Sequence, residues 1–156
     1  RGVAFERDMT QVVRADTLRP KAHRQILQDF NEPLVEMYVG VYKPKAGLRF
    51  ADVLVIERKP LPGQSPRVET FSFKSRDFSG MDYEAVRAQM SADARAALAY
   101  YGETLNIRRP GLEGRVKVLR VRLIYQGGAL APKPSDMEKA LSATKATVPG
   151  VEVLFR

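Results

Sequence analysis

Apolar residues follow two different rhythms along this chain, and the rhythm changes several times between its two ends. Steps of three and four place apolar side chains on one face of an α-helix, whereas alternation or a short apolar run favours a β-strand. The helical rhythm predicts helices at 3–18, 20–30, 81–105 and 135–146. Runs rich in Val, Ile, Phe and Tyr predict strands at 35–44, 49–59, 67–76, 115–126 and 151–156.

The segment at 81–105 has the most regular helical pattern of the chain. Its apolar stripe consists of Tyr83, Val86, Met90, Ala94, Ala97 and Tyr101. Asp82 can cap the beginning of this helix, and Gly102 can end it. The last helix begins with Ser135 and Glu138, which have the spacing of a capping box. In the first helix the stripe consists of Phe5, Met9, Val12 and Val13.

The order of these elements predicts an α/β fold with a mixed central sheet. Three successive strands at 35–76 indicate an antiparallel meander, and the long helix after them requires a parallel pairing with a right-handed crossover. We expect helices on both faces of the sheet, in the order α-β-β-β-α-β-α-β once the short helix at 20–30 is left out. Residues 1–156 are expected to form one domain, cut from a larger polypeptide because the chain begins with Arg1 and not Met.

Composition narrows the chemistry that the chain can perform. There is no cysteine and only one histidine, His23, which excludes disulfides, thiolate chemistry and multi-histidine metal sites. A metal would have to be held by carboxylates and other oxygens, as Mg²⁺ or Mn²⁺ is. The 26 Lys and Arg against 18 Asp and Glu give a net charge of +8, which favours nucleic acid, an acidic protein or an anionic membrane surface as partner. No apolar run is long enough to span a membrane.

Asp52 stands in the apolar run of the second strand, where a carboxylate is unfavourable unless it is paired or binds a cation. On the next strand Ser72 and Lys74 share one face, and antiparallel pairing would bring Lys74 opposite Asp52. One interpretation is an ordinary cross-strand ion pair. The other is phosphodiester hydrolysis, in which a carboxylate holds a divalent cation and a lysine orients water or stabilises charge on the phosphate.

The segments "GVAFE", "RFADVLV" and "FSFKS", in this order of elements, resemble the PD-(D/E)xK, or restriction-endonuclease-like, nuclease superfamily. The resemblance implies that Asp52, Lys74 and Glu6 are catalytic, that Gln89 on the following helix contributes, and that Asp52 and Glu6 hold Mg²⁺ or Mn²⁺. It implies DNA as substrate in preference to RNA. The size and charge also resemble the C-terminal nuclease toxin domains of bacterial polymorphic toxins. Those domains are delivered into the cytoplasm of a rival cell and are neutralised by a cognate immunity protein.

Ser72 departs from the family pattern, which has Glu or Asp at this position. The missing carboxylate could come from the long helix, where Glu84 and Gln89 lie on opposite flanks and Asp93 lies one turn from Gln89. Ser72 could instead contribute its hydroxyl or carbonyl, with Glu6 as the second acid. The site could also be inactive. Glu69 and Glu57 are poor substitutes because their odd-numbered positions point to the other face.

The remaining candidates concern binding. Arg108, Arg109, Arg115 and Lys117 are candidates for contact with phosphates, and Arg120 and Arg122 add to the same concentration of charge. His23, by contrast, is expected to be a surface residue, Tyr101 a core residue, and the pair Gly127-Gly128 a hinge. The competing functions are an inactive module that binds nucleic acid or a protein on the same fold, and an adaptor for an acidic protein.

Overall fold

The computed structural model describes residues 2–156 and contains a seven-stranded sheet with three α-helices. The helices are α1 (Gly2–Thr17), α2 (Tyr83–Tyr101) and α3 (Pro134–Thr147), with short 3-10 helices at Lys21–His23 and Gly128–Leu130. The strands are β1 (Pro33–Lys43), β2 (Gly47–Glu57), β3 (Val68–Lys74), β4 (Thr104–Ile107), β5 (Gly114–Lys117), β6 (Arg120–Tyr125) and β7 (Val151–Phe155). No helix within residues 2–156 is long and apolar enough to cross a membrane.

The sheet is mixed and has the strand order β5-β4-β1-β2-β3-β6-β7. Strands β1, β2 and β3 form the expected antiparallel meander, and α2 leads to the parallel pairing of β3 with β6. A second parallel pairing joins β6 to β7 across α3. The α/β class and the mixed sheet predicted from the sequence are therefore confirmed.

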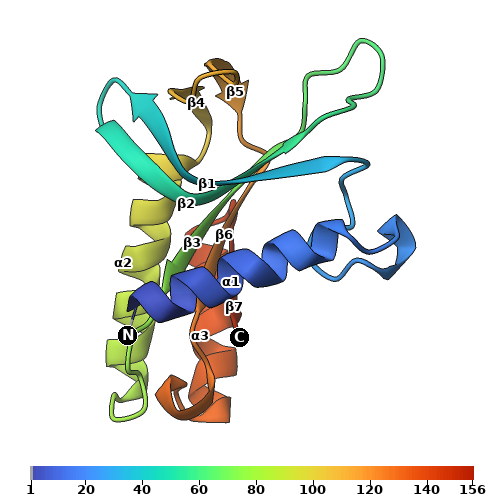
Figure 1. Cartoon of the computed structure of the whole chain (residues 1–156). Helices are drawn as coiled ribbons and strands as arrows, with labels where there is room; N and C mark the ends of the chain where they lie inside the picture. Colours follow the sequence, from blue (N-terminus) through green and yellow to red (C-terminus); the bar gives the residue numbers. More distant parts are fainter. Residues whose placement is uncertain (1) are drawn as a thin grey trace.

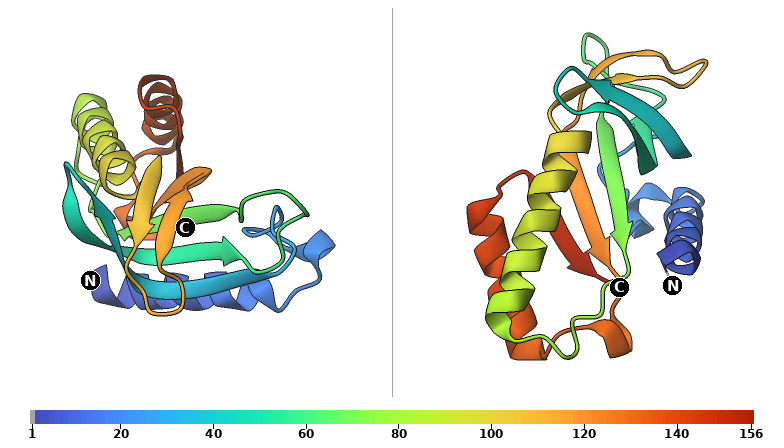
Figure 2. Two further views of the ribbon diagram at one scale, coloured as in Figure 1. Left: turned by 90° about the horizontal axis from the view of Figure 1, so that it is seen from above. Right: turned by 90° about the vertical axis from the view of Figure 1, so that its left-hand side faces the viewer.

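Two hydrophobic cores lie on opposite faces of this sheet, and α1 covers one face while α2 and α3 cover the other (Figure 1, Figure 2). On the α1 side, Phe5, Met9 and Val13 pack against Val53 and Phe71. On the other side, the stripe of α2 packs against β3 and β6; its buried members are Val86, Met90, Ala94 and Ala97. Burial of these apolar side chains is the main favourable contribution to folding.

Several local predictions were right and several were wrong. Asp82 does cap α2, because its side chain accepts the N–H of Ala85, and Gly102 follows the last residue of the helix. Ser135 is no cap: α3 begins one residue earlier, at Pro134, and its N-cap Lys133 makes no side-chain hydrogen bond. Proline has no N–H group that would need a partner in the first turn of a helix. This explains why α3 begins at Pro134 and not after Ser135.

The segment expected to be one strand at 115–126 is divided between β5 and β6. The expected turn before it is a hairpin of β4 and β5. The expected second helix at 20–30 is a single 3-10 turn followed by loop, and Val12 is exposed, not part of the stripe. Helix nucleation is unfavourable, so a short segment is not helical without supporting contacts. Here the tertiary contacts stabilise a loop conformation instead.

Two carboxylates hold these loops. Asp16, in the last turn of α1, accepts the backbone N–H groups of Gln25, Ile26 and Leu27. Glu57, at the end of β2, accepts the N–H groups of residues 31, 32 and 59 in the same way. Both side chains are acceptors for backbone groups that no helix or strand satisfies.

Candidate active site

The pair of strands β1 and β2 is kinked at Tyr38 and Asp52. The two strands are in register on both sides of this point, from Pro33 opposite Glu57 to Lys43 opposite Gly47, and Tyr38 faces Asp52 in the gap of the ladder. Tyr38 has a φ of 51°, a left-handed conformation that is uncommon for a bulky residue. Backbone strain of this kind clusters at functional sites.

The kink changes which core the hairpin faces. Before it, Val35 and its neighbours Val53 and Val55 belong to the core under α1. After it, Val39 and Val41, which simple alternation would place on the same face as Val35, belong to the core under α2. The hairpin thus passes from one layer to the other, and it curls over the C-terminal end of α2 (Figure 1). Asp52 lies at this crossing, within reach of both layers.

Asp52 also marks the point where β2 leaves β3. Their ladder ends with Val53 opposite Phe71, and beyond it the N–H of Phe73 donates to Asp52 Oδ2 at 2.8 Å instead of to a strand carbonyl. Burial raises the pKa of Asp52 to about 6; the Phe73 hydrogen bond lowers it, the charge of Glu6 raises it, and the charge of Lys74 lowers it. Asp52 is therefore a desolvated carboxylate that interacts with both an acid and a base.

The charge of Glu6 acts on Asp52 from α1, the helix on the other face of the sheet from Lys74. Glu6 Oε2 accepts a hydrogen bond from the Tyr38 hydroxyl at 3.2 Å. The charge of Glu6 raises the pKa of Tyr38, and so, more weakly, does that of Asp52. Tyr38, which the sequence did not identify as a candidate, thus holds the Glu6 carboxylate, whose charge acts on Asp52.

Lys74 lies at the end of β3, on the α2 side, opposite Tyr125 of β6. The ordinary cross-strand ion pair, one of the two interpretations of this pair, does not form. None of the salt bridges among residues 2–156 involves Lys74, although its charge acts on Asp52. Its neighbour Ser72 is buried on the same side. An amino group that is partly buried and not neutralised by direct contact is available to a ligand.

Asp93 of α2 is buried in a network of its own. Arg76 donates to both of its oxygens, at 2.6 and 2.8 Å, the Tyr125 hydroxyl donates at 2.7 Å, and Gln89 donates at 3.0 Å. Gln89 therefore binds Asp93, and none of the hydrogen bonds among residues 2–156 joins it to Asp52, Glu6 or Lys74. Burial and the charge of Asp93 raise the pKa of Tyr125 far above its usual value, so that the phenol stays a donor.

The surroundings of Glu84, Asp93 and Glu6 indicate which acid could replace the carboxylate that is missing at Ser72. Glu84 points into solvent and pairs with Arg87. Asp93 is already held by three side chains. Of the alternatives considered, Glu6 is the acid whose charge the structure brings to bear on Asp52. Glu69 is fully buried among arginines on the other side of the sheet, and Glu57 holds a loop, as the alternation of their strands predicts.

The basic residues divide into two groups. Arg109 is a structural residue, because it donates to Glu36 and to the carbonyls of Met37 and Tyr38 at the kink. Arg120 and Arg122 are also engaged, with Glu152 and Glu69. Arg122 is buried, so its predicted place on an open basic surface is wrong. Arg109 and Arg120 are partly exposed, and their contact with phosphates stays a prediction. The other three candidates are Arg108, Arg115 and Lys117, and they stay on the outside of the molecule.

The donor set suits a hard cation that keeps most of its water. Asp52 Oδ1 accepts no hydrogen bond from residues 2–156, and the Glu6 carboxylate lies close enough to raise the pKa of Asp52. Within those residues no three His, Cys, Asp or Glu side chains are grouped to hold a metal, so the protein supplies two acids at most. Mg²⁺ is commonly bound by one or two carboxylates together with water and substrate phosphate.

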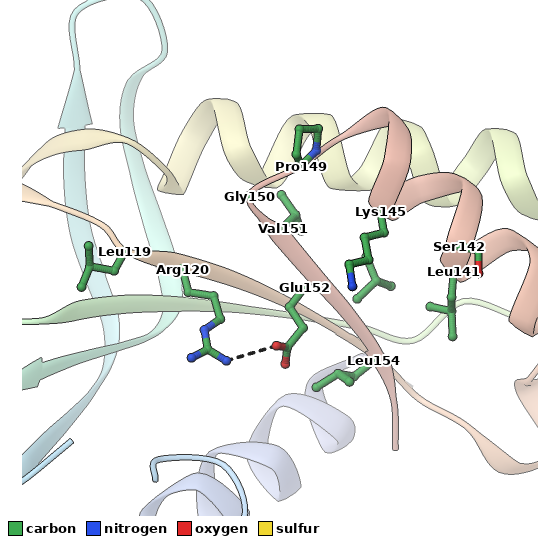
Figure 3. A pocket seen from close by; sticks show the side chains of 11 residues that line it. Leu119, Arg120, Leu141, Ser142, Lys145, Pro149, Gly150, Val151, Glu152 and Leu154 are labelled. Carbon is green, nitrogen blue, oxygen red and sulfur yellow. Dashed lines mark hydrogen bonds and ion pairs between the residues drawn. The ribbon is translucent and has the colours of Figure 1, made fainter. Parts of the chain in front are cut away.

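The clearest hollows of the surface lie elsewhere. A groove of about 650 Å³ runs along β7 and α3, lined by Leu141, Lys145 and Glu152 among others (Figure 3). A smaller one of about 250 Å³ lies beside Arg122 and Gln25. Neither is lined by Asp52, Glu6 or Lys74. A polymer such as nucleic acid binds along a surface and does not require a deep hollow at the reacting residues.

No protein-family model, curated protein or solved structure matches this chain. The function must therefore be inferred from the arrangement of its own residues.

Proposed function

We propose that this chain is a divalent-metal-dependent nuclease with a restriction-endonuclease-like arrangement, acting on DNA in preference to RNA. The observation that carries the proposal is the environment of Asp52. It is a desolvated carboxylate at a strained kink, and the charges of Glu6 and Lys74 act on it from opposite layers. Pairs of ionisable groups with perturbed pKa values are common at catalytic sites.

Each residue has a distinct role in this proposal. A bound Mg²⁺ or Mn²⁺ would lower the pKa of a water molecule and neutralise charge on the scissile phosphate. Asp52, held by the Phe73 N–H, is the principal ligand, and Glu6, held by Tyr38, is the second acid. Lys74 orients the attacking water or stabilises the phosphate oxygens. Gln89 acts through Asp93, as a positioning residue for the segment that follows Lys74.

A second candidate is an inactive module that binds nucleic acid or a protein. Ser72 supports it, because no three acids are grouped within residues 2–156, whereas the nucleases that this chain resembles have a further carboxylate at this position. Cutting decides between the two candidates. An adaptor for an acidic protein is distinguished by its failure to bind nucleic acid even at low salt.

The biological setting follows from the resemblance to toxin domains, and it is part of the proposal. The chain would act in the cytoplasm of a target cell after delivery from a producing bacterium, and a cognate immunity protein would block it. Induced expression in a bacterial host tests this directly. Wild-type protein should arrest growth and degrade the host DNA, whereas Asp52→Asn should do neither.

The decisive experiment incubates purified protein with plasmid DNA and with total RNA, in Mg²⁺ and in EDTA. We expect cutting in Mg²⁺ alone, and loss of cutting in Asp52→Asn and in Lys74→Ala. Lys145→Ala is the control for Lys74→Ala, because it removes an exposed lysine of α3 far from the site. Circular dichroism and a thermal melt check that each variant is folded.

Absence of cutting in every condition would leave the inactive module. Full activity of folded Lys74→Ala would remove Lys74 from the mechanism.

A further inference from the structure

The four strands at one end of the sheet carry a continuous row of side chains across their register. Leu48 of β2 lies opposite Tyr42 of β1, Tyr42 opposite Asn106 of β4, and Asn106 opposite Arg115 of β5. Residues that pair across antiparallel strands point to the same face. We call this surface the outer face; it consists of Tyr42, Leu48, Phe50, Arg108, Arg115 and Lys117.

The alternate residues of the same strands show that this face points away from the core. Val41, Leu105 and Ile107 are buried in the core under α2, and Val116 packs against it. Their neighbours Arg115 and Lys117 are exposed. The outer face is therefore the solvent side of the two hairpins.

Large apolar side chains are exposed on this face without a covering element. Phe50 is 57% exposed and Leu48 is 55% exposed. They gather over Gly40, since a Cβ at Gly40 would lie 3.5 Å from the Phe50 ring and from Arg108 Cβ, and 3.6 Å from Leu48 Cδ1. Tyr38, two residues before Gly40, is 49% exposed and binds Glu6, so it lies where the outer face meets the candidate active site.

Positive charge accompanies these rings. The Arg108 guanidinium stacks on the Tyr42 ring at 5.1 Å, and Arg115 and Lys117 follow on β5. None of the salt bridges among residues 2–156 involves Arg108, Arg115 or Lys117. Exposed rings alternating with unpaired cations suit a polymer that presents both flat bases and phosphates. An acidic protein could also cover Phe50 and Leu48 and pair with the cations, so it is the competing occupant that the binding test below distinguishes.

We propose that the outer face binds single-stranded nucleic acid, with unpaired bases stacked on Phe50 and Tyr38 and the backbone on Arg108, Arg115 and Lys117. A duplex keeps its bases stacked on one another, so it could use the cations but not the rings. The inference rests on the proposed function in one respect. The path of the bound nucleic acid, from the outer face past Tyr38 to Asp52, assumes that Asp52 is the catalytic centre. It makes single-stranded DNA the preferred substrate of the site, with duplex plasmid a poorer substrate that is still cut.

The test measures binding in EDTA, where no cutting occurs, so it does not depend on catalysis. Fluorescence anisotropy is recorded with labelled single-stranded DNA, single-stranded RNA and duplex DNA of mixed sequence, over a range of salt concentrations. Phe50→Ala should weaken single-strand binding about tenfold and leave duplex binding unchanged. Leu61→Ala is the matched control, because Leu61 is 58% exposed in the loop between β2 and β3, and it should change neither.

The cations give a second, independent readout. Arg115→Ala should weaken binding to all three probes and lower the slope of log affinity against log salt by about 0.7 for a single strand. Lys145→Ala should leave the slope unchanged. Comparison of the DNA and RNA single strands then separates the two sources of unpaired bases.

Equal affinity for single-stranded and duplex DNA, or unchanged single-strand binding in Phe50→Ala, would overturn the inference even if the protein cuts plasmid. Binding that follows these expectations without any cutting would leave the inference standing and remove the nuclease. Failure to bind any of the three probes at low salt would assign the outer face to a protein partner and overturn the inference as well.

Discussion

Asp16 and Asp52 both lie where the backbone changes direction, but their surroundings act on them in opposite ways. Asp16 receives three backbone N–H groups from the loop that it holds. Burial raises its pKa, but these hydrogen bonds outweigh burial, so the pKa of Asp16 is lowered. Asp52 receives one N–H, from Phe73, and burial together with the Glu6 charge raises its pKa to about 6.

The difference separates a structural carboxylate from one that is free to act. A carboxylate whose lone pairs are filled by backbone donors stabilises the fold and has nothing left for a ligand. Asp52 keeps one oxygen without a donor from residues 2–156 and is subject to the charge of a second acid, Glu6. This arrangement destabilises the fold unless a cation binds. The predictions below test this contrast, beginning with the largest effect.

Activity should depend on Asp52 and not on Asp16. Asp52→Asn is expected to reduce cutting at least about a thousandfold, since it removes the charge of the principal metal ligand. Asp16→Asn should cut like wild type when rates are corrected for the folded fraction. Rates from plasmid nicking in Mg²⁺ are the measurement, and similar losses in the two variants would remove the contrast.

Stability, in contrast to activity, should depend on Asp16. Asp16→Ala leaves three N–H groups of the loop without their acceptor and should lower the free energy of unfolding at pH 7 by about 3 kcal/mol. Asp8→Ala, which changes an exposed carboxylate of the same helix, should be nearly neutral. Urea denaturation measures both variants.

The same lowered pKa values predict sensitivity to acid. Asp16 and Glu57 titrate lower in the folded than in the unfolded chain, so their stabilisation is complete above the unfolded value and is lost as pH falls through the folded one. The stability of wild-type protein should therefore fall below about pH 4. Asp16→Ala should show a shallower fall, and an equally steep one would contradict this role.

Asp52→Asn should make the protein more stable near neutral pH. The pKa of Asp52 is higher in the folded chain, so the wild-type fold binds a proton that the unfolded chain has lost between about pH 4 and 6, and it is destabilised above that range. The variant should gain about 1–2 kcal/mol at pH 8 and little at pH 3.5. Thermal melts across pH measure this difference, and destabilisation at pH 8 would make Asp52 a structural residue like Asp16.

The smallest effect is expected for Tyr38→Phe, which removes only the hydroxyl that holds Glu6. Cutting should fall about fivefold with no change in the melting temperature, because a side-chain hydrogen bond at an exposed position contributes little to the fold. Glu6→Gln should reduce cutting more than Tyr38→Phe. Additive losses in the double variant would show that Tyr38 does not act through Glu6.

The sequence predicted the fold class because its strongest patterns are local. The stripe of α2 and the apolar runs of β2, β3 and β6 each fix an element without knowledge of the rest. The β4–β5 hairpin was missed because its strands have four residues each and β5 carries charged side chains on the outer face. Ser135 has the residue pattern of a cap, but Pro134 begins the helix first.

The candidate site was predictable only in part, for a physical reason. Alternation along β2 and β3 identified Asp52, Ser72 and Lys74 and excluded Glu69. It could not place Glu6, Tyr38 or Gln89, because their positions depend on the kink and on contacts between layers. One signal for Tyr38 was available. Counting back from the turn along the two strands of the hairpin places position 38 opposite Asp52.

The most direct measurement is anomalous diffraction from crystals of the protein bound to a short oligonucleotide and soaked in Mn²⁺. The account predicts a peak between the Asp52 and Glu6 carboxylates, with a backbone phosphate and the Lys74 amino group beside it. A peak at another place, or a phosphate bound away from Asp52, would contradict the claim that this kink is the active site of a nuclease.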